Sequence, residues 1–207
     1  GFYEVDKDVQ KNTKAALKKL KGAGCTIEEV DLGWTPKVMA AATNYLGHLF
    51  GGVIGQVLSR HRYEMMPYAV EIAEMGARST ASDFIESLAI AGEMYDTLGP
   101  ILQKYDALIC PTNASAKIPA DLDSTRDTVK INGVEVNPFL GWAMTPAFNI
   151  MSRCPVLAVP SGRDSTGTPT GIQIVGPTYE DATVFRIGAA IEAADPWYTK
   201  AAQRPKL

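Results

Sequence analysis

Long apolar runs are missing from the sequence: none approaches the roughly 18 consecutive residues that a membrane-spanning helix requires. We therefore expect no association with a membrane. Cysteine is also scarce, because the three that occur, Cys25, Cys110 and Cys154, cannot all pair and none belongs to a C-x-x-C arrangement. This pattern predicts three buried free thiols in a protein of the reducing, cytoplasmic compartment.

Net charge and histidine are likewise low. A net charge of −3 and a pI near 5.5 give no electrostatic reason to expect nucleic acid as a partner. The lysines that cluster near the amino-terminal end are typical of a solvated helix face. His48 and His61 are far apart, and no H-E-x-x-H motif occurs. We expect neither a metal nor a cofactor.

The sequence contains none of the common motifs that supply a nucleophile for acyl transfer. There is no Ser-Ser pair, no S-x-x-K and no G-x-S-x-G. Ser161 and Ser165 lie in a predicted turn and have no base close to them in the sequence. An acyl-enzyme mechanism needs an activated nucleophile, a base and oxyanion donors. No catalytic residue is therefore assigned within these 207 residues.

Length and patterning indicate a globular piece with a sizeable core. A content of 46% hydrophobic and 21% charged residues is enough to form a buried hydrophobic core. The pattern predicts a helix-strand opening over residues 1–32, a helical part over 35–104, a sheet core with a final helix over 105–195 and a polar tail over 196–207. Asp6 and Thr178 are predicted to cap the first and the last helix, and residues 25–32 to form a strand. The chain begins with Gly1, without a starting Met or a signal-peptide pattern, which fits a fragment or a processed product.

The stretch 137–176 predicts the centre of the fold. Two apolar runs, 155–160 and 171–175, have the length of buried strands, and a loop over 161–170 rich in Ser, Gly, Thr, Asp and Pro separates them. Gln173 is flanked by isoleucines on the second run, so we expect its amide to fix a neighbouring loop. The pattern is that of an α/β domain.

Candidate site residues follow a third predicted strand, 106–110, which ends in Pro111, Thr112 and Asn113. Ligand sites in open α/β sheets form just beyond the carboxyl ends of strands, although simple termination of the strand explains Thr112 equally well. The following loop, 114–127, is long, and Asn132-Gly133 then predicts a hairpin turn. Thr145 and Asn149 are polar residues in an apolar context, and each needs a hydrogen-bond partner, from backbone or substrate. Phe148 fits the core and a pocket equally well.

These residues also carry a resemblance to the amidase signature family. Its pattern T-x-x-F-N matches Thr145, Phe148 and Asn149. Its pattern P-a-x-x-V-P-x-G matches Pro155, Val159, Pro160 and Gly162, and its pattern G-x-P-x-G-x-Q-x-x-G matches Gly167, Pro169, Gly171, Gln173 and Gly176. The segments 5–9, 24–32 and 106–112 are similar to further family patterns, so the resemblance extends over most of the chain.

The resemblance implies the C-terminal part of the amidase signature fold, a mixed β-sheet flanked by helices. Family members hydrolyse amide C–N bonds with a serine nucleophile, a second serine in a cis peptide and a lysine base, and these would lie upstream of residue 1. Thr112, Asn113, Thr145, Phe148 and Asn149 would then line the substrate pocket.

Several expectations about partners follow from that resemblance. The partners would be the N-terminal part of the same enzyme and a small-molecule amide, and this chain alone would be inactive. An uncovered sheet edge would favour a homo-oligomer. Two alternatives remain: a fragment of a glutamine-dependent amidotransferase subunit, and a non-catalytic binding or scaffold module on the same fold.

Overall fold

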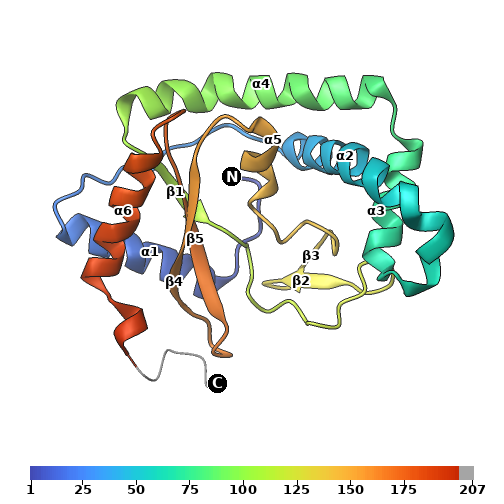
Figure 1. The fold of residues 1–207 in the computed structure, drawn as a ribbon. Coiled ribbons are helices and arrows are strands. Elements are labelled where there is room, and N and C mark those ends of the chain that lie inside the picture. The colour runs from blue at the N-terminus through green and yellow to red at the C-terminus, as the bar shows by residue number, and fades with distance from the viewer. Residues whose placement is uncertain (201–207) are drawn as a thin grey trace.

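A computed structural model describes residues 1–200 (Figure 1). The helices are α1 Lys7–Gly22, α2 Lys37–His61, α3 Pro67–Arg78, α4 Ala81–Lys104, α5 Pro146–Met151 and α6 Asp181–Ala194, with 3-10 turns at Arg62–Glu64 and Trp197–Thr199. The strands are β1 Leu108–Pro111, β2 Val129–Ile131, β3 Val134–Val136, β4 Val156–Arg163 and β5 Pro169–Val175. Of the polar tail predicted over 196–207, the part from residue 201 onward lies outside the described residues.

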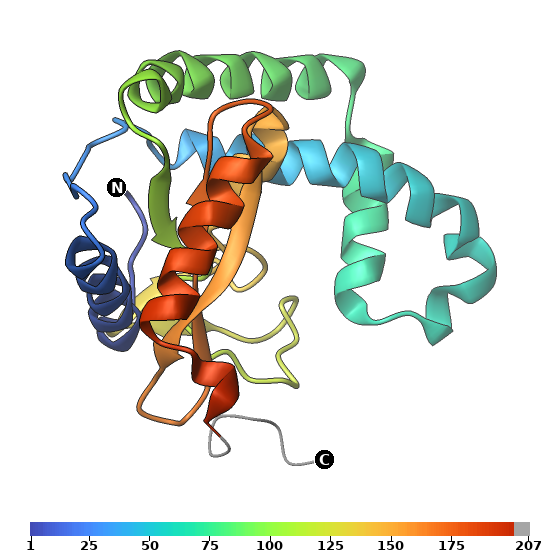
Figure 2. The ribbon, with the colours of Figure 1, turned by 60° about the vertical axis from the view of Figure 1, so that its left-hand side comes forward.

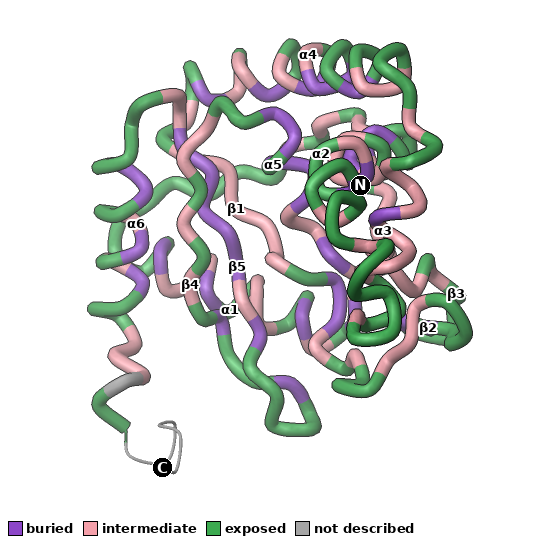
Figure 3. Tube along the Cα trace, turned by 45° about the vertical axis from the view of Figure 1, so that its right-hand side comes forward, coloured by how far each residue is buried: buried purple, intermediate pink, exposed green. Residues whose placement is uncertain are grey.

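The central sheet has the order β1-β5-β4, and both pairings are antiparallel. Successive side chains of a strand point to opposite faces. Ile172 and Ile174 of β5 accordingly pack against α1 and α6, whereas Val175 packs with α2, α4 and α5. The result is a sheet between two helical layers, with buried β5 in its middle (Figure 3). This confirms the α/β class. The resemblance implies a mixed sheet, and among the described strands both pairings of the central sheet are antiparallel.

Helices α2 and α3 pack against each other in a part of the molecule that extends away from the sheet (Figure 2). Glycine allows their close approach. A Cβ added to Gly51 would lie 2.4 Å from the Ile72 carbonyl oxygen and 2.6 Å from the Gly76 Cα. Gly51 therefore serves the packing of one helix against the other.

Of the two predicted helix caps, Asp6 is confirmed and Thr178 is not. The Asp6 side chain accepts a hydrogen bond from the Asp8 N–H, and Thr80 and Asp83 form a reciprocal capping box at α4. The prediction for Thr178 is wrong, because α6 begins after Glu180 without a side-chain cap. The Thr178 hydroxyl instead bonds the Tyr95 hydroxyl, at 3.1 Å.

The predicted hairpin and the strands predicted over 106–110, 155–160 and 171–175 are present, but the bounds of the strands differ from the prediction. The hairpin β2–β3 turns at Asn132 and Gly133, both with positive φ. Strands β4 and β5 reach into the predicted loop 161–170. The strand predicted over 25–32 is wrong, because no described strand pairs with it and β propensity without a partner does not make a strand. Strand β4 is an edge strand with one exposed face, not a buried one.

The cysteines differ in environment. Cys110 and Cys154 are partly buried, but Cys25 is exposed beyond the end of α1, so the prediction of three buried thiols is wrong there. Burial raises the pKa of the Cys110 thiol to about 12, which keeps it protonated and unreactive. Among residues 1–200, no helix combines the length and the apolar character needed to cross a bilayer.

Candidate functional site

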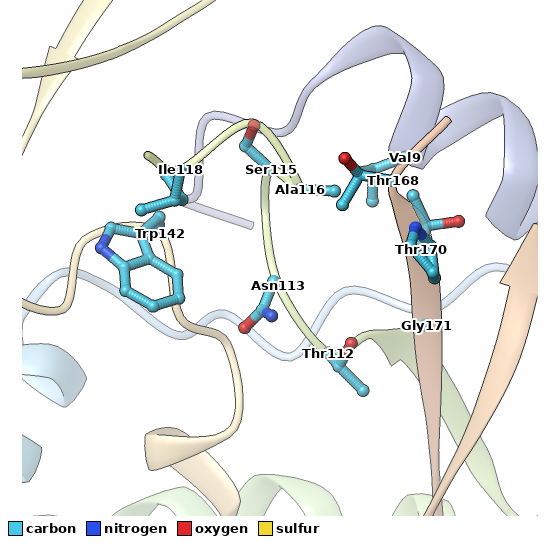
Figure 4. A pocket seen from close by; sticks show the side chains of 11 residues that line it. Val9, Thr112, Asn113, Ser115, Ala116, Ile118, Trp142, Thr168, Thr170 and Gly171 are labelled. Carbon is cyan, nitrogen blue, oxygen red and sulfur yellow. The ribbon is translucent and has the colours of Figure 1, made fainter. Parts of the chain in front are cut away.

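A cavity of about 210 Å³ lies where the end of β1, the start of β5, the loop after β1 and the first turn of α1 meet (Figure 4). Its polar lining is neutral, from Thr112, Asn113, Ser115, Thr168 and Thr170. The larger apolar side chains in its lining are Val9, Ile118 and Trp142. Figure 4 shows Trp142 on one side of the loop that carries Asn113, and Thr168 and Thr170 on the other.

Gln173 fixes the backbone beside this cavity. Its side chain is fully buried, and its Nε2 donates to the carbonyl oxygens of Pro111 at 2.9 Å and Met144 at 3.3 Å. The amide thus ties the residue before Thr112 to the residue before Thr145. This confirms the role that the sequence predicts for Gln173.

Thr112 is held by the backbone on two sides. Its N–H donates to the Gly171 carbonyl at 3.0 Å, and its own carbonyl accepts from the Met144 N–H at 3.0 Å. A Cβ on Gly171 would lie 2.8 Å from the Thr112 Oγ1. Glycine at position 171 therefore leaves room for the Thr112 hydroxyl at the cavity wall.

The loop after Thr112 is hydrogen-bonded to the segment that precedes α5. The Ala114 N–H donates to the Trp142 carbonyl at 2.7 Å, and the Trp142 Nε1–H donates to the Pro138 carbonyl at 3.0 Å. The second bond fixes the plane of the indole. Trp142 therefore presents a fixed aromatic surface to the cavity.

One ammonium group holds three segments around the cavity together. Lys117 Nζ lies 3.0 Å from Asp6 Oδ2 and 3.0 Å from Asp8 Oδ2, and the latter oxygen also accepts from the backbone N–H and the hydroxyl of Ser165. The bonds from Ser165 and Lys117 hold the pKa of Asp8 well below its usual range. Asp8 and Asp6 in turn raise the pKa of Lys117. A lysine held in this way stays charged and does not serve as a base.

The β4–β5 turn is held by side chains as well. Asn12 of α1 donates to the Thr170 Oγ1 and to the Arg163 carbonyl, both at 2.9 Å, and Ser161 shares a 2.9 Å bond with Thr170. Asp164 Oδ1 accepts from the N–H groups of Thr166 and Thr168, both at 2.9 Å. These bonds fix the side of the cavity that Thr168 and Thr170 form.

The structure separates the five predicted site residues. Thr112 and Asn113 line the cavity, and Thr145 is close by, one residue after Met144, whose N–H binds Thr112. Phe148 is only 6% exposed and packs in the core against Trp34, with ring centroids 5.5 Å apart. Asn149 is exposed on α5.

Free polar groups remain at these positions. Within residues 1–200, no hydrogen bond is made by the Thr112 hydroxyl, the Asn113 amide, the Thr145 hydroxyl or the Asn149 amide. Groups of this kind at a cavity wall are available to a ligand. A substrate contact of Thr112, Asn113, Thr145, Phe148 and Asn149 stays a prediction.

Several lining residues escape prediction from the sequence. Ser115 and Ile118 lie in the loop 114–127, whose length singles out no particular residue, and Thr168 and Thr170 lie in a segment predicted to be a plain turn. Trp142 is a large aromatic residue, which by itself favours a place in the core. Only the meeting of three distant segments makes these side chains neighbours.

No described serine is paired with a base in the cavity. Ser165 donates to Asp8, and Ser161 bonds Thr170. The one Ser–His bond among residues 1–200 joins Ser79 and His48, at 3.0 Å, between α2 and the end of α3, and neither residue lines the cavity. Within the same described range, no group of three or more His, Cys, Asp or Glu side chains is placed to hold a metal ion.

Comparison with known proteins assigns the family. Residues 1–185 match the family model described as Amidase. The chain belongs to the amidase signature family.

Individual relatives agree with this assignment. The chain is 33% identical to an acylamidase of Rhodococcus erythropolis over 140 residues, which are 67% of this chain and 28% of the relative. It is 27% identical to a glutamyl-tRNA(Gln) amidotransferase subunit of Exiguobacterium sibiricum, over 92% of this chain and 42% of the relative. The chain thus spans less than half the length of these relatives.

Solved structures show the same fold. A bacterial aryl acylamidase of the amidase signature family superposes with a TM-score of 0.82 and 23% identity, over 100% of this chain and 44% of that chain. At this identity the likeness concerns the fold alone. The amidase fold therefore includes the whole described arrangement of sheet and helices.

Proposed function

We propose that this amidase chain is the C-terminal part of an enzyme that hydrolyses carboxylic amides through a serine acyl-enzyme. The observation that carries the proposal is the cavity at the family motifs. Thr112 and Asn113 face it with free polar groups, and Gly171 leaves room for the Thr112 hydroxyl. The cavity supplies binding surface, and the nucleophile, the base and the oxyanion donors come from a part of the enzyme outside this chain.

The side chains around the cavity support this division of labour. Lys117 is held charged by two carboxylates, and the Ser165 hydroxyl donates a hydrogen bond to one of them. Lys117 cannot accept a proton while it is charged, and Asp8, whose pKa is held well below its usual range, is a weak base for the Ser165 hydroxyl. The role of the chain is then to bind and orient the amide, which converts attack on its carbonyl into an effectively intramolecular step.

Uncovered apolar surface supports a large partner. Phe50, Val53 and Val57 lie on one face of α2 and are 53%, 65% and 44% exposed, and Val156 of the edge strand β4 is 40% exposed. We assign these two exposed patches to contacts with the N-terminal part of the same enzyme, and in its absence with a second copy of the chain. Light scattering after size-exclusion chromatography would report a monomer if the second assignment is wrong. The three free thiols support a cytoplasmic location.

The test compares the 207-residue chain with the protein encoded by its complete reading frame. We expect the complete protein to hydrolyse an anilide such as 4-nitroacetanilide, and the chain alone to be inactive. Hydrolysis by the chain alone would contradict the proposed division of labour. A complete protein that binds amides without hydrolysing any would instead be a binding module.

A second function is favoured by the relatives that are amidotransferase subunits, including the one that covers 92% of this chain. In that case the enzyme would release ammonia from glutamine and pass it to an acceptor on a partner subunit. Measuring the complete protein with glutamine and with simple amides separates the two functions. Activity with glutamine alone would favour the amidotransferase.

A further inference from the structure

The cavity contains no charged side chain among its lining residues, although charged groups lie just outside it. We infer that it selects an uncharged group of the amide substrate, either one aromatic ring or a short alkyl chain. This inference rests on the proposed function, because it names the class of substrate for the same site.

Three of the charged groups outside the cavity are satisfied by one another. Lys117 is bonded to Asp6 and Asp8, and Asp8 is bonded to Ser165. None of the three charged residues belongs to the lining. A substrate carboxylate would therefore find no cation in the cavity.

An ammonium group would find no carboxylate among the residues that line the cavity. The nearby Asp164 binds its own turn through Oδ1, and it does not line the cavity. Its Oδ2 has no hydrogen-bond partner among the described residues, but this oxygen is buried, so an ammonium group in the cavity cannot contact it. An ion of either sign would leave water without a counter-charge, and desolvation of an unpaired ion is costly.

The size of the cavity sets the second part of the inference. An apolar cavity of about 150 Å³ in another protein holds benzene, and complete ligand pockets measure about 300–1,000 Å³. The volume here, about 210 Å³, accommodates one ring or a short chain and not a whole larger substrate.

The lining has two kinds of surface that suit such a group. Trp142, Ile118 and Val9 offer apolar contact, and the indole plane is fixed by its bond to Pro138. The free groups of Thr112 and Asn113 line the same cavity and can bond the neutral amide itself. An apolar group with an adjacent amide matches both surfaces.

This assignment separates the two functions proposed above. Glutamine carries an ammonium and a carboxylate next to each other, and both need counter-charges. The cavity provides neither, which favours a simple neutral amide over glutamine as the substrate whose side group binds here.

The test measures binding, independently of turnover. The ¹⁵N-labelled chain is titrated with benzamide, 4-carboxybenzamide and 4-(aminomethyl)benzamide, and the indole N–H resonance of Trp142 is followed by NMR. We expect benzamide to shift this resonance and to bind at least about 30-fold more tightly than either charged analogue, the factor that ~2 kcal/mol of unpaired charge represents. Equal binding of the three ligands, or no effect of benzamide, would overturn the inference.

A variant with a new charge makes the test sharper. Ile118→Lys places a cation at the wall of the cavity, and we expect it to tighten binding of 4-carboxybenzamide by about tenfold or more. Ile118→Met is the neutral control and should leave the order of the three ligands unchanged. If Ile118→Lys does not tighten the binding of 4-carboxybenzamide, the cavity is not where the ligand binds.

Failure of the inference and failure of the proposed function give different results. If benzamide binds as expected but the complete protein hydrolyses no amide, the function is wrong and the binding preference stands. If the complete protein hydrolyses neutral and charged benzamides at equal kcat/KM, the function stands and the inference is overturned.

Discussion

Gln173 offers the sharpest test of how the cavity wall is held. We predict that Gln173→Met, which keeps the length of the side chain and removes its donors, destabilises the protein. The carbonyl oxygens of Pro111 and Met144 both lose their bond to a fully buried amide. Each buried group left without a partner costs about 1–3 kcal/mol.

Removal of the Gln173 Oε1 offsets part of this loss of stability. The Gln173 Oε1 is buried without a partner among residues 1–200, so its removal returns about 1 kcal/mol. The net loss is about 1–5 kcal/mol, which corresponds to a fall in Tm of about 2–20 °C for a protein of this size. Urea unfolding followed by circular dichroism measures the free energy directly.

Two further variants separate the loss of the buried donors from a general effect of replacing glutamine. Gln103 is exposed on α4, so Gln103→Met should change the free energy of unfolding by no more than about 0.5 kcal/mol. Gln173→Glu keeps the shape of the side chain and turns the donor into an acceptor. The variant should therefore be less stable than Gln173→Met at pH 7, and its stability should increase at lower pH as the carboxyl becomes protonated. Gln173→Met as stable as the wild type would refute the reasoning.

The remaining predictions concern helix packing and pH. Gly51→Ala should lower the free energy of unfolding by about 1–3 kcal/mol, because its Cβ would meet the backbone of α3. Gly52→Ala, whose Cβ would have nothing within 4 Å, should raise it by about 0.5–1 kcal/mol through helix propensity. Thermal unfolding would show opposite shifts in Tm, and equal shifts would contradict the α2–α3 contact. The bonds from Lys19 and Lys200 lower the pKa of Asp195 to about 2, below the roughly 3.9 of an unfolded chain. Its stabilisation is therefore present above about pH 4 and lost as the pH falls toward 2. Asp195→Asn should thus be less stable than the wild type at pH 6 and approach it at pH 2, and a difference that does not vary with pH would show that the ion pairs contribute nothing.

Local signals predict most of the secondary structure. The capping box at Thr80 and the turn at Asn132-Gly133 are set by neighbours in sequence, so both are predictable. The strand at 25–32 is not, because a strand depends on a partner that no local pattern shows. The cap at Thr178 fails for a similar reason: the hydroxyl bonds Tyr95 of α4, 83 positions away.

The candidate site is predictable only where a strand end marks it. Thr112 and Asn113 follow β1 directly, and both line the cavity. Val9 and Thr170 reach the same cavity from α1 and β5, and their meeting depends on contacts such as that of Asn12 with Thr170 across 158 positions. Phe148 shows the opposite limit, since its pattern fits core and pocket alike and the structure buries it against Trp34.

The most direct test of the central claim is to locate the reactive serine. The complete protein is treated with a fluorophosphonate probe, digested, and the modified peptide is identified by mass spectrometry. We predict one labelled serine, outside residues 1–207, and no labelling of the chain by itself. A label on Ser115, Ser161, Ser165 or any other serine of this chain would show that it carries the nucleophile, and the proposed division of labour would be wrong.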